Sequence, residues 1–258
     1  MDKDKALKVS IITVVRNNKE TIKDAIDSVL SQTYKDIEYI VIDGGSTDGT
    51  VDIVKEYQDK ISVFISEPDE GIYDAMNKGI ALATGNVIGI LNSDDFYIDE
   101  FVIEKVVKEF EEKNVDSVYA DLVYVEPKNL NKTVRYYDSS KFNPSKFSYG
   151  WMPAHPTFFV KKDTYEKHGV FRTDLKIAAD FDILIRFLLT HKISYSYMQE
   201  VLVKMRVGGV STSFNSIWII NTEQLQVCRD NNIGTNIFKI LLKYPGKILG
   251  CFKRNRIL

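Results

Sequence analysis

Two adjacent carboxylates, Asp94 and Asp95, are the side chains of this sequence best suited to holding a charged ligand. They follow the apolar run 86–91, which is typical of a buried strand. Neighbouring carboxylates repel each other, and their burial is costly unless a cation or a donor-rich ligand meets them. In open α/β sheets, ligands bind at the carboxyl ends of strands. The segment 92–95 therefore predicts a divalent metal site with a phosphorylated ligand on its far side.

The elements that must position this pair alternate between strand and helix. The predicted strands are rich in β-branched residues and cover residues 9–15, 37–42, 61–66 and 87–91. The predicted helices have apolar residues at helical spacing and cover residues 21–30, 51–57 and 72–83. Gly85 is expected to close the third of these helices. This alternation favours a mostly parallel sheet covered by helices.

The pattern becomes less regular after the acidic pair. Further helices are predicted over residues 99–113, 162–167 and 181–189. Further strands are predicted over 117–125 and 157–160, with a final strand pair over 195–207. The aromatic and polar stretch 126–151 is interpreted as a hairpin or a loop excursion.

Composition narrows the class of protein. The 258 residues are 44% hydrophobic and 27% charged, as in a soluble globular protein with a real core. The net charge of −2 gives no reason to expect a nucleic-acid partner. The two cysteines, Cys228 and Cys251, form neither a disulfide framework nor a CxxC site, which favours a reducing compartment. Residues 1–8 lack the apolar core of a signal peptide, so we expect a cytoplasmic protein.

The last segment of the chain differs from the rest. Residues 234–258 contain six Lys or Arg and no Asp or Glu. Apolar residues recur there at helical spacing beside a row of lysines, as in basic amphipathic segments that lie on anionic membranes. We therefore expect peripheral contact with the inner face of the plasma membrane. The alternative is that this segment packs on the rest of the protein or on a second subunit in a homodimer.

Several motifs together resemble those of the family 2 inverting glycosyltransferases, which have a GT-A fold. The similar segments occur in the order expected for the family and cover residues 9–17, 39–50, 75–79, 91–95 and 179–182. The segment 69–74 also looks like the branch that builds bacterial surface polysaccharides. The sequence departs from the pattern at Asn92 and Ala179, where many relatives have an acid.

The resemblance implies an α/β GT-A fold, Rossmann-like, with a mostly parallel central sheet flanked by helices. It assigns residues 1–210 to the catalytic domain. The nucleotide-sugar half would cover about 1–97 and the acceptor half about 98–210. Residues 211–258 would form a C-terminal helical, basic amphipathic extension.

The resemblance also implies roles for individual residues. Asp180 is the expected catalytic base, and Asp95 the expected ligand of Mn²⁺ or Mg²⁺. The expected nucleotide-binding residues are Thr13, Val15, Asn17, Asp43, Asn77 and Asp94. The expected acceptor or loop residues are Trp151, His155, Asp182, Arg206 and Ser211.

Some of these roles have structural alternatives. Asp43 and Asp180 could each cap a following helix instead of meeting a ligand. His155 could be a structural histidine, and Arg206 either faces a diphosphate or lies on the surface. Because Asn92 replaces an acid, we expect few protein ligands on the metal and weak metal binding without the donor.

The implied reaction is a single displacement that moves a hexose, glucose or galactose, from a UDP-sugar to a lipid-linked or oligosaccharide acceptor. The expected acceptor is a HexNAc-diphosphate-undecaprenyl in O-antigen or capsule assembly. One alternative is a sugar-phosphate nucleotidyltransferase, which would need a glycine-rich phosphate loop where this chain has residues 15–18. Another is a non-catalytic nucleotide-sugar-binding protein.

Overall fold

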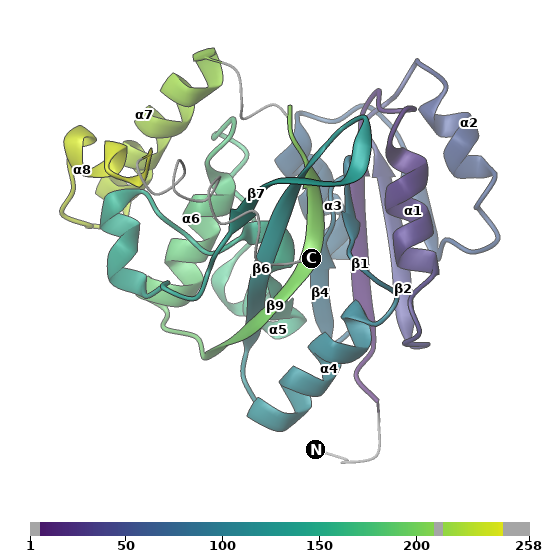
Figure 1. Ribbon diagram of the computed structural model, residues 1–258, viewed down its shortest axis with the longest axis horizontal. Helices are drawn as coiled ribbons and strands as arrows, with labels where there is room; N and C mark the ends of the chain where they lie inside the picture. The colour runs from purple at the N-terminus through teal and green to yellow at the C-terminus, as the bar shows by residue number, and fades with distance from the viewer. Residues whose placement is uncertain (1–5, 209–213, 245–258) are drawn as a thin grey trace.

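A curled sheet of nine strands forms the centre of the protein (Figure 1). The structure is a computed structural model, and it describes residues 6–208 and 214–244. The strand order is β3-β2-β1-β4-β8-β6-β9-β5, and β7 pairs with β6 outside this path. Helices cover both faces of the sheet, so the α/β architecture expected from the sequence is confirmed.

The first half of the chain forms four parallel strands. They are β1 (Val9–Val15), β2 (Ile37–Asp43), β3 (Val63–Ser66) and β4 (Val87–Ile90). The helices between them are α1 (Ile22–Leu30), α2 (Thr50–Lys55) and α3 (Ile72–Leu82). The chain moves from β1 to β2 and β3, and α3 then returns it to the other side of β1. This reversal of strand order between β1 and β4 is where such sheets bind ligands.

The second half adds four antiparallel pairings and one long parallel pairing. Its strands are β5 (Asp95–Tyr97), β6 (Ser117–Glu126), β7 (Asn129–Tyr137), β8 (Phe159–Lys161) and β9 (Tyr195–Arg206). Its helices are α4 (Val102–Lys113), α5 (Lys162–His168) and α6 (Ala179–Ile185), and α6 continues as a π-helical turn, Arg186–Thr190. Two 3₁₀ turns connect β7 to β8: Pro144–Tyr149 and His155–Thr157.

Two hydrophobic layers hold this arrangement. Helices α1 and α4 bury their apolar stripes on one face of the sheet, and α3 and α6 bury theirs on the other. The strand β1 is buried along its whole length, which explains its β-branched sequence. Complete burial of each large aliphatic side chain contributes about 1.5–3 kcal/mol. The layers therefore fix the strand ends at which the candidate site lies.

The structure corrects two local predictions and adds a strand that was not predicted. Residues 195–206 form one long strand and not a strand pair, because β9 pairs along its length with β6. The short strand β5 was not predicted, since it forms by pairing with β9. Gly85 does not close α3; a Cβ there would lie 2.7 Å from the backbone nitrogen of Ser10 and 2.8 Å from the carbonyl oxygen of Lys8. Gly85 is thus needed for close approach to β1.

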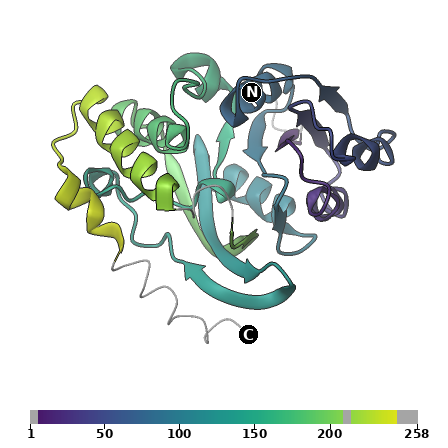
Figure 2. The same cartoon turned by 90° about the horizontal axis from the view of Figure 1, so that it is seen from above.

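The C-terminal part of the described chain is helical. It contains α7 (Phe214–Asp230) and α8 (Ile237–Leu241), which lie side by side at the end of the sheet opposite α2 (Figure 2). Ile240 and Lys243 are buried, so the start of the predicted membrane segment packs on protein. The rest of that segment, 245–258, lies outside the described residues. Within the described ranges, no helix combines the length and apolarity needed to span a bilayer.

Candidate functional site

A cleft of about 570 Å³ opens at the carboxyl ends of β1 and β4. Residues from both halves of the chain and from α7 line it. The cleft brings together six of the thirteen residues predicted to form the site: Val15, Asn17, Asp94, Trp151, His155 and Asp180. It is large enough for a sugar nucleotide and lies where an open α/β sheet binds ligands.

The acidic pair lies at the floor of this cleft. Asp94 lines the cleft, whereas Asp95 at the start of β5 is fully buried. Asp95 Oδ2 accepts a long hydrogen bond of 3.5 Å from Asn92 Nδ2. Within the described chain, Asp95 Oδ1 and Asn92 Oδ1 are both buried without a hydrogen-bond partner. Burial raises the pKa of Asp95 well above its usual range, and the charge of Asp94 raises it further.

These oxygens fit a divalent cation. Carboxylate and amide oxygens are the protein ligands that Mg²⁺ and Mn²⁺ prefer, and two buried oxygens without partners are costly unless something binds them. No cluster of three His, Cys, Asp or Glu suited to a metal occurs in residues 6–208 and 214–244. A cation held by Asp95, Asn92 and Asp94 would therefore take its remaining ligands from phosphate oxygens or water.

Arg206 supports the acidic pair from outside the cleft. Its side chain is only 7% exposed. Nη1 donates a 2.6 Å hydrogen bond to the carbonyl oxygen of Asp94, and Nη2 pairs with Asp24 of α1. The guanidinium also lies over the Phe96 ring, 4.9 Å from its centroid. Arg206 thus holds the backbone of the acidic turn, and its charge offsets part of the rise in the pKa of both carboxylates.

The loop after β2 holds the loop after β1 in place. Asn17 has a left-handed backbone with φ of 51°. Its N–H donates to Ser46 Oγ at 2.7 Å, and its Oδ1 accepts from the Thr47 N–H at 2.8 Å. The Lys19 N–H donates to Asp48 Oδ2 at 3.1 Å. These bonds fix the cleft wall that Asn17 forms.

Asp43 is buried at the end of β2, next in register to the cleft residue Val15. Its Oδ2 accepts from the N–H groups of Gly45 and Ser46 and, at 2.7 Å, from Ser66 Oγ. Its Oδ1 is buried and has no partner among the described residues. Its partners lie in the turn after β2 and on β3, and the N-cap of α2 is Gly49, so Asp43 does not cap α2. Asp43 is not on the cleft surface itself.

Two residues predicted to bind nucleotide have other partners. The hydroxyl of Thr13 lies 3.1 Å from that of Tyr39 in the core beneath α1. Both ends of the Asn77 side-chain amide pair with the backbone of Phe171, each at 2.9 Å. Neither Thr13 nor Asn77 lines the cleft. Asn77 instead connects α3 to the segment between α5 and α6.

Asp182 also points away from the cleft. Its Oδ2 accepts from Arg186 Nε at 2.8 Å, and its Oδ1 lies 3.7 Å from Arg172 Nη1. Since the carboxylate is buried and ion-paired, Asp182 serves the packing of α6. Ser211, the remaining predicted loop residue, lies outside the described residues.

Asp180 faces the cleft from the first turn of α6, with its side chain 15% exposed. The N-cap of α6 is Ala178, so Asp180 is not the helix cap. Its Oδ2 lies 3.2 Å from the Tyr73 hydroxyl and 3.7 Å from His155 Nε2. The single proton of the Tyr73 hydroxyl can be donated either to Asp180 Oδ2 or to the carbonyl oxygen of Ile177, which lies 2.7 Å away. Burial, followed by the charge of Asp180, raises the pKa of Tyr73 well above its usual value, so the phenol stays protonated.

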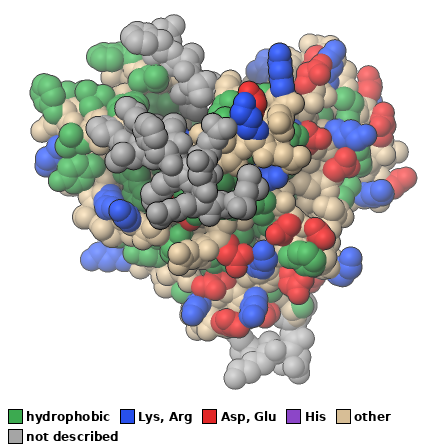
Figure 3. All heavy atoms as spheres, in the orientation of Figure 1, with side chains coloured by type: hydrophobic (Ala, Val, Ile, Leu, Met, Phe, Trp, Pro, Cys, Tyr) green, Lys and Arg blue, Asp and Glu red, His purple; other side chains and the backbone are tan. Residues whose placement is uncertain are grey.

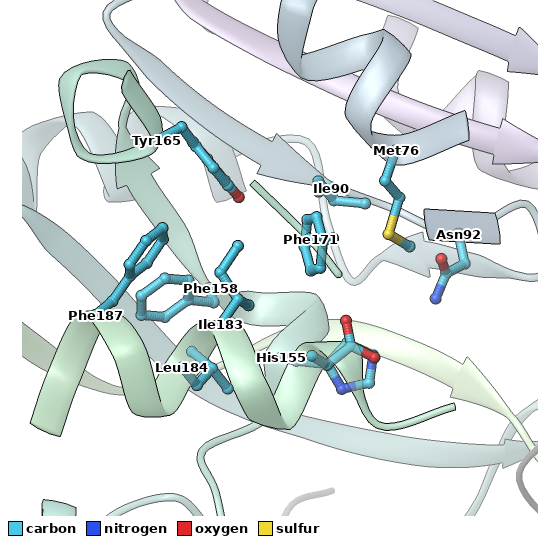
Figure 4. Close-up of a pocket in the computed structure, with 11 residues that line it drawn as sticks. Met76, Ile90, Asn92, His155, Phe158, Tyr165, Phe171, Ile183, Leu184 and Phe187 are labelled. Carbon is cyan, nitrogen blue, oxygen red and sulfur yellow. The ribbon is translucent and has the colours of Figure 1, made fainter. Parts of the chain in front are cut away.

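Asp180 also lines a small cavity of about 30 Å³, which Figure 4 shows. Figure 4 shows Asn92 and His155 at its polar edge, whereas Met76, Phe171 and Leu184 belong to its apolar wall. A space of this size can hold a water molecule where polar groups meet it. Asp180 thus lines both the open cleft and this mostly apolar cavity.

Glu223 is a residue of the site that the sequence did not indicate. It lies on α7, and its carboxylate accepts hydrogen bonds from three consecutive backbone N–H groups just before α6. The distances are 2.8 Å to Lys176, 2.9 Å to Ile177 and 2.9 Å to Ala178. No local pattern could have revealed it, because its partners lie far away in the sequence. The C-terminal helix thus holds the segment that presents Asp180.

We expect Glu223→Gln to slow catalysis without weakening nucleotide binding. The amide has one acceptor oxygen, so at least one N–H loses its partner, at about 1–3 kcal/mol. Displacement of the segment that presents the base then lowers kcat about ten- to hundredfold. Gln226→Ala, an exposed change on the same helix, is the control. Hydrogen exchange should report faster exchange at residues 176–178; unchanged protection there would contradict this role.

The family profile described as "Glycosyl transferase family 2" matches residues 10–170 of this chain. An uncharacterized glycosyltransferase of Rickettsia typhi is 32% identical over 212 residues, which are 80% of this chain and 65% of that relative. The chain therefore spans just under two thirds of that relative's length. A PGL/p-HBAD biosynthesis glycosyltransferase of Mycobacterium bovis is 26% identical over 246 residues, which are 93% of this chain and 91% of that protein.

Solved structures share the fold at low identity. S. aureus TarS in complex with UDP has a TM-score of 0.62 at 18% identity, covering 84% of this chain and 65% of the other. The mannosyltransferase PcManGT from Pyrobaculum calidifontis, in complex with GDP-Man and Mn²⁺, has a TM-score of 0.66 at 20% identity. That match covers 92% of this chain and 69% of the other. At these identities the likeness concerns the fold.

Proposed function

Because this chain belongs to glycosyl transferase family 2, we propose that it moves a hexose, with glucose or galactose favoured, from a UDP-sugar to a sugar acceptor with inversion. The expected GT-A fold is confirmed. The family assignment gives no support to a nucleotidyltransferase. The observation that carries the proposal is one cleft lined by both Asp94 and Asp180, with Asp95 buried next to Asp94.

In the proposed reaction, the acceptor hydroxyl attacks the anomeric carbon of the donor. The bond from that carbon to the diphosphate oxygen breaks, and the hydroxyl proton passes to Asp180. The Tyr73 hydroxyl, 3.2 Å from Asp180 Oδ2, orients the carboxylate. A divalent cation held by Asp95, Asn92 and Asp94 would neutralise charge on the leaving diphosphate. Because inversion needs one displacement, no covalent intermediate on the protein is required.

We propose uridine as the nucleoside, with Asp43 as the acceptor for its base; because Asp43 lies beneath the cleft surface, the wall beside Val15 must shift to admit the ring. The uracil ring offers a single N–H at N3, and Asp43 has one buried acceptor, Oδ1, without a partner in the described chain. A guanine ring offers adjacent donors at N1 and N2 and would need two acceptors. Since Gly45, Ser46 and Ser66 already occupy Oδ2, one acceptor matches uracil better.

The opposite end of the cleft supports a lipid-linked acceptor, which we propose to be a HexNAc-diphosphate-undecaprenyl in O-antigen or capsule assembly. Ile220 and Gln224 of α7 line that end. Trp218 on α7 is 68% exposed and Phe238 on α8 is 78% exposed. Figure 3 shows hydrophobic side chains gathered over these two helices. Such a surface would suit peripheral contact with the inner face of an anionic membrane.

A donor screen tests this function. The full chain with Mn²⁺ is incubated with UDP-glucose, UDP-galactose, other UDP-sugars and GDP-mannose, and with a GlcNAc- or GalNAc-diphosphate-lipid analogue as acceptor. We expect transfer from UDP-glucose or UDP-galactose, with an inverted linkage detected by NMR. Faster transfer to acceptor in anionic vesicles than in neutral vesicles would support the membrane proposal. A preference for GDP-mannose would overturn the uridine assignment, and UDP binding without transfer or hydrolysis would indicate a non-catalytic protein.

A further inference from the structure

Arg135 is a cation on the cleft wall that none of the predicted site motifs includes. It lies on β7, and its guanidinium is 3.9 Å from the centroid of the Tyr124 ring and 5.8 Å from that of Tyr137. No carboxylate in the described ranges forms an ion pair with it. Lys132 on the same strand, by contrast, pairs with Glu126 at 2.8 Å. Arg135 is therefore oriented by an aromatic face and not by an opposite charge.

The sheet register places Arg135 and Asp95 in one row. Asp95 of β5 pairs with Met205 of β9, Met205 pairs with Tyr124 of β6, and Tyr124 pairs with Arg135 of β7. Cross-strand partners project to the same face of a sheet. Three strand spacings separate the Cα atoms of Asp95 and Arg135 by about 14 Å. Tyr124 lies between them and is electrostatically affected by both.

A guanidinium held in this way is suited to a phosphate. A guanidinium that lies over an aromatic ring has five N–H groups, and those not bonded to the tyrosine stay available for an anion. They can form two parallel hydrogen bonds to a phosphate, a geometry that a lysine cannot reproduce. Because the ring fixes the guanidinium plane in advance, less side-chain entropy is lost on binding.

We propose that Arg135 binds a phosphate group in the cleft, across the sheet from the acidic pair. This inference rests on the proposed function, in which both substrates carry phosphate. The phosphate belongs either to the diphosphate of the donor or to that of the acceptor. In the first case Arg135 stabilises the departing nucleotide, and in the second it sets the position of the acceptor.

The test compares Arg135→Met, which keeps the apolar stem on Tyr124, with Arg135→Lys, which keeps the charge but not the fork. Lys132→Met, a cation removed from the same strand outside the cleft, is the matched control. Calorimetry on the full chain with Mn²⁺ measures binding of UDP, uridine and inorganic pyrophosphate. A further titration measures GlcNAc 1-phosphate binding to the UDP-saturated protein.

If the phosphate belongs to the donor, Arg135→Met raises the Kd of UDP and of pyrophosphate about tenfold or more and leaves that of uridine unchanged. If it belongs to the acceptor, UDP binding is unchanged and the Kd of GlcNAc 1-phosphate rises about tenfold or more. In either case Arg135→Lys recovers only part of the loss, and Lys132→Met behaves as wild type.

Equal binding of all phosphate probes by wild type and Arg135→Met would overturn the inference, as would a wild type that binds none of them. The proposed function can fail separately. Pyrophosphate binding that depends on Arg135, without any sugar transfer, would keep the phosphate site and remove the transferase. Sugar transfer that is unaffected by Arg135→Met would keep the transferase and remove the phosphate site.

Discussion

Replacing Asp180 by Asn is expected to remove nearly all sugar transfer while the fold and UDP binding are kept. The side chains have the same shape, and Asp180 does not cap α6, so no helix-stabilising bond is lost. The Tyr73 hydroxyl keeps its 2.7 Å bond to the carbonyl oxygen of Ile177. The amide cannot accept the proton of the acceptor, and the loss of a general base lowers kcat about 10²- to 10⁴-fold.

Asp182→Asn provides the contrast for this experiment. Asp182 lies two residues further along α6 but faces Arg186 and not the cleft. Breaking a buried ion pair costs about 3–5 kcal/mol, so this variant should melt at lower temperature. Below its melting transition it should keep most of its kcat. Steady-state kinetics and UDP titration on both variants separate the two roles; turnover retained by Asp180→Asn would move the base to another group, such as His155.

Replacing Asp95 by Asn is expected to stabilise the metal-free protein and to abolish its response to Mn²⁺. Asp95 is fully buried, and its Oδ1 has no partner among the described residues. Its pKa is raised well above the usual range, chiefly by burial. The folded protein therefore keeps the Asp95 carboxyl protonated at pH values where this group has lost its proton in the unfolded chain. Stability falls as pH rises from the unfolded pKa to the raised pKa, and Asn removes that penalty.

Thermal melting between pH 4 and 8, with and without MnCl₂, measures this effect. Mn²⁺ should raise the Tm of the wild type at neutral pH, and the gain should vanish as protons compete for Asp95 at low pH. Asp95→Asn should show no gain and should lose about a hundredfold or more in transfer, because a metal contributes several kcal/mol. Asp52→Asn, an exposed change on α2, controls for the loss of one charge.

Two outcomes would contradict this account of Asp95. An equal Mn²⁺-dependent rise in Tm for the wild type and for Asp95→Asn would place the metal elsewhere. Tight Mn²⁺ binding by the wild type without nucleotide would contradict the expectation of few protein ligands, which rests on Asn92 in place of an acid.

The sequence by itself determined the first half of the fold and where its strand ends meet. The strands β1 and β2 are runs of buried, mostly β-branched or aromatic residues, so their positions follow from local patterns. Parallel strands bring their carboxyl ends to one edge of a sheet, which explains why Val15 and Asp94 line one cleft. The apolar helix after Asp180 was predicted for the same local reason.

The direction and partners of many site side chains were decided only by the tertiary structure. Asn77 and Arg206 were predicted to contact ligands, yet their side chains bond to backbone atoms of distant segments. Glu223 and Arg135 carried no local signal, because one acts through the segment before α6 and the other through its cross-strand neighbours. A motif fixes residue identity at one place in the chain, whereas hydrogen bonds and sheet register join places far apart. The acidic pair could therefore be found in the sequence, but not the residues that hold and face it.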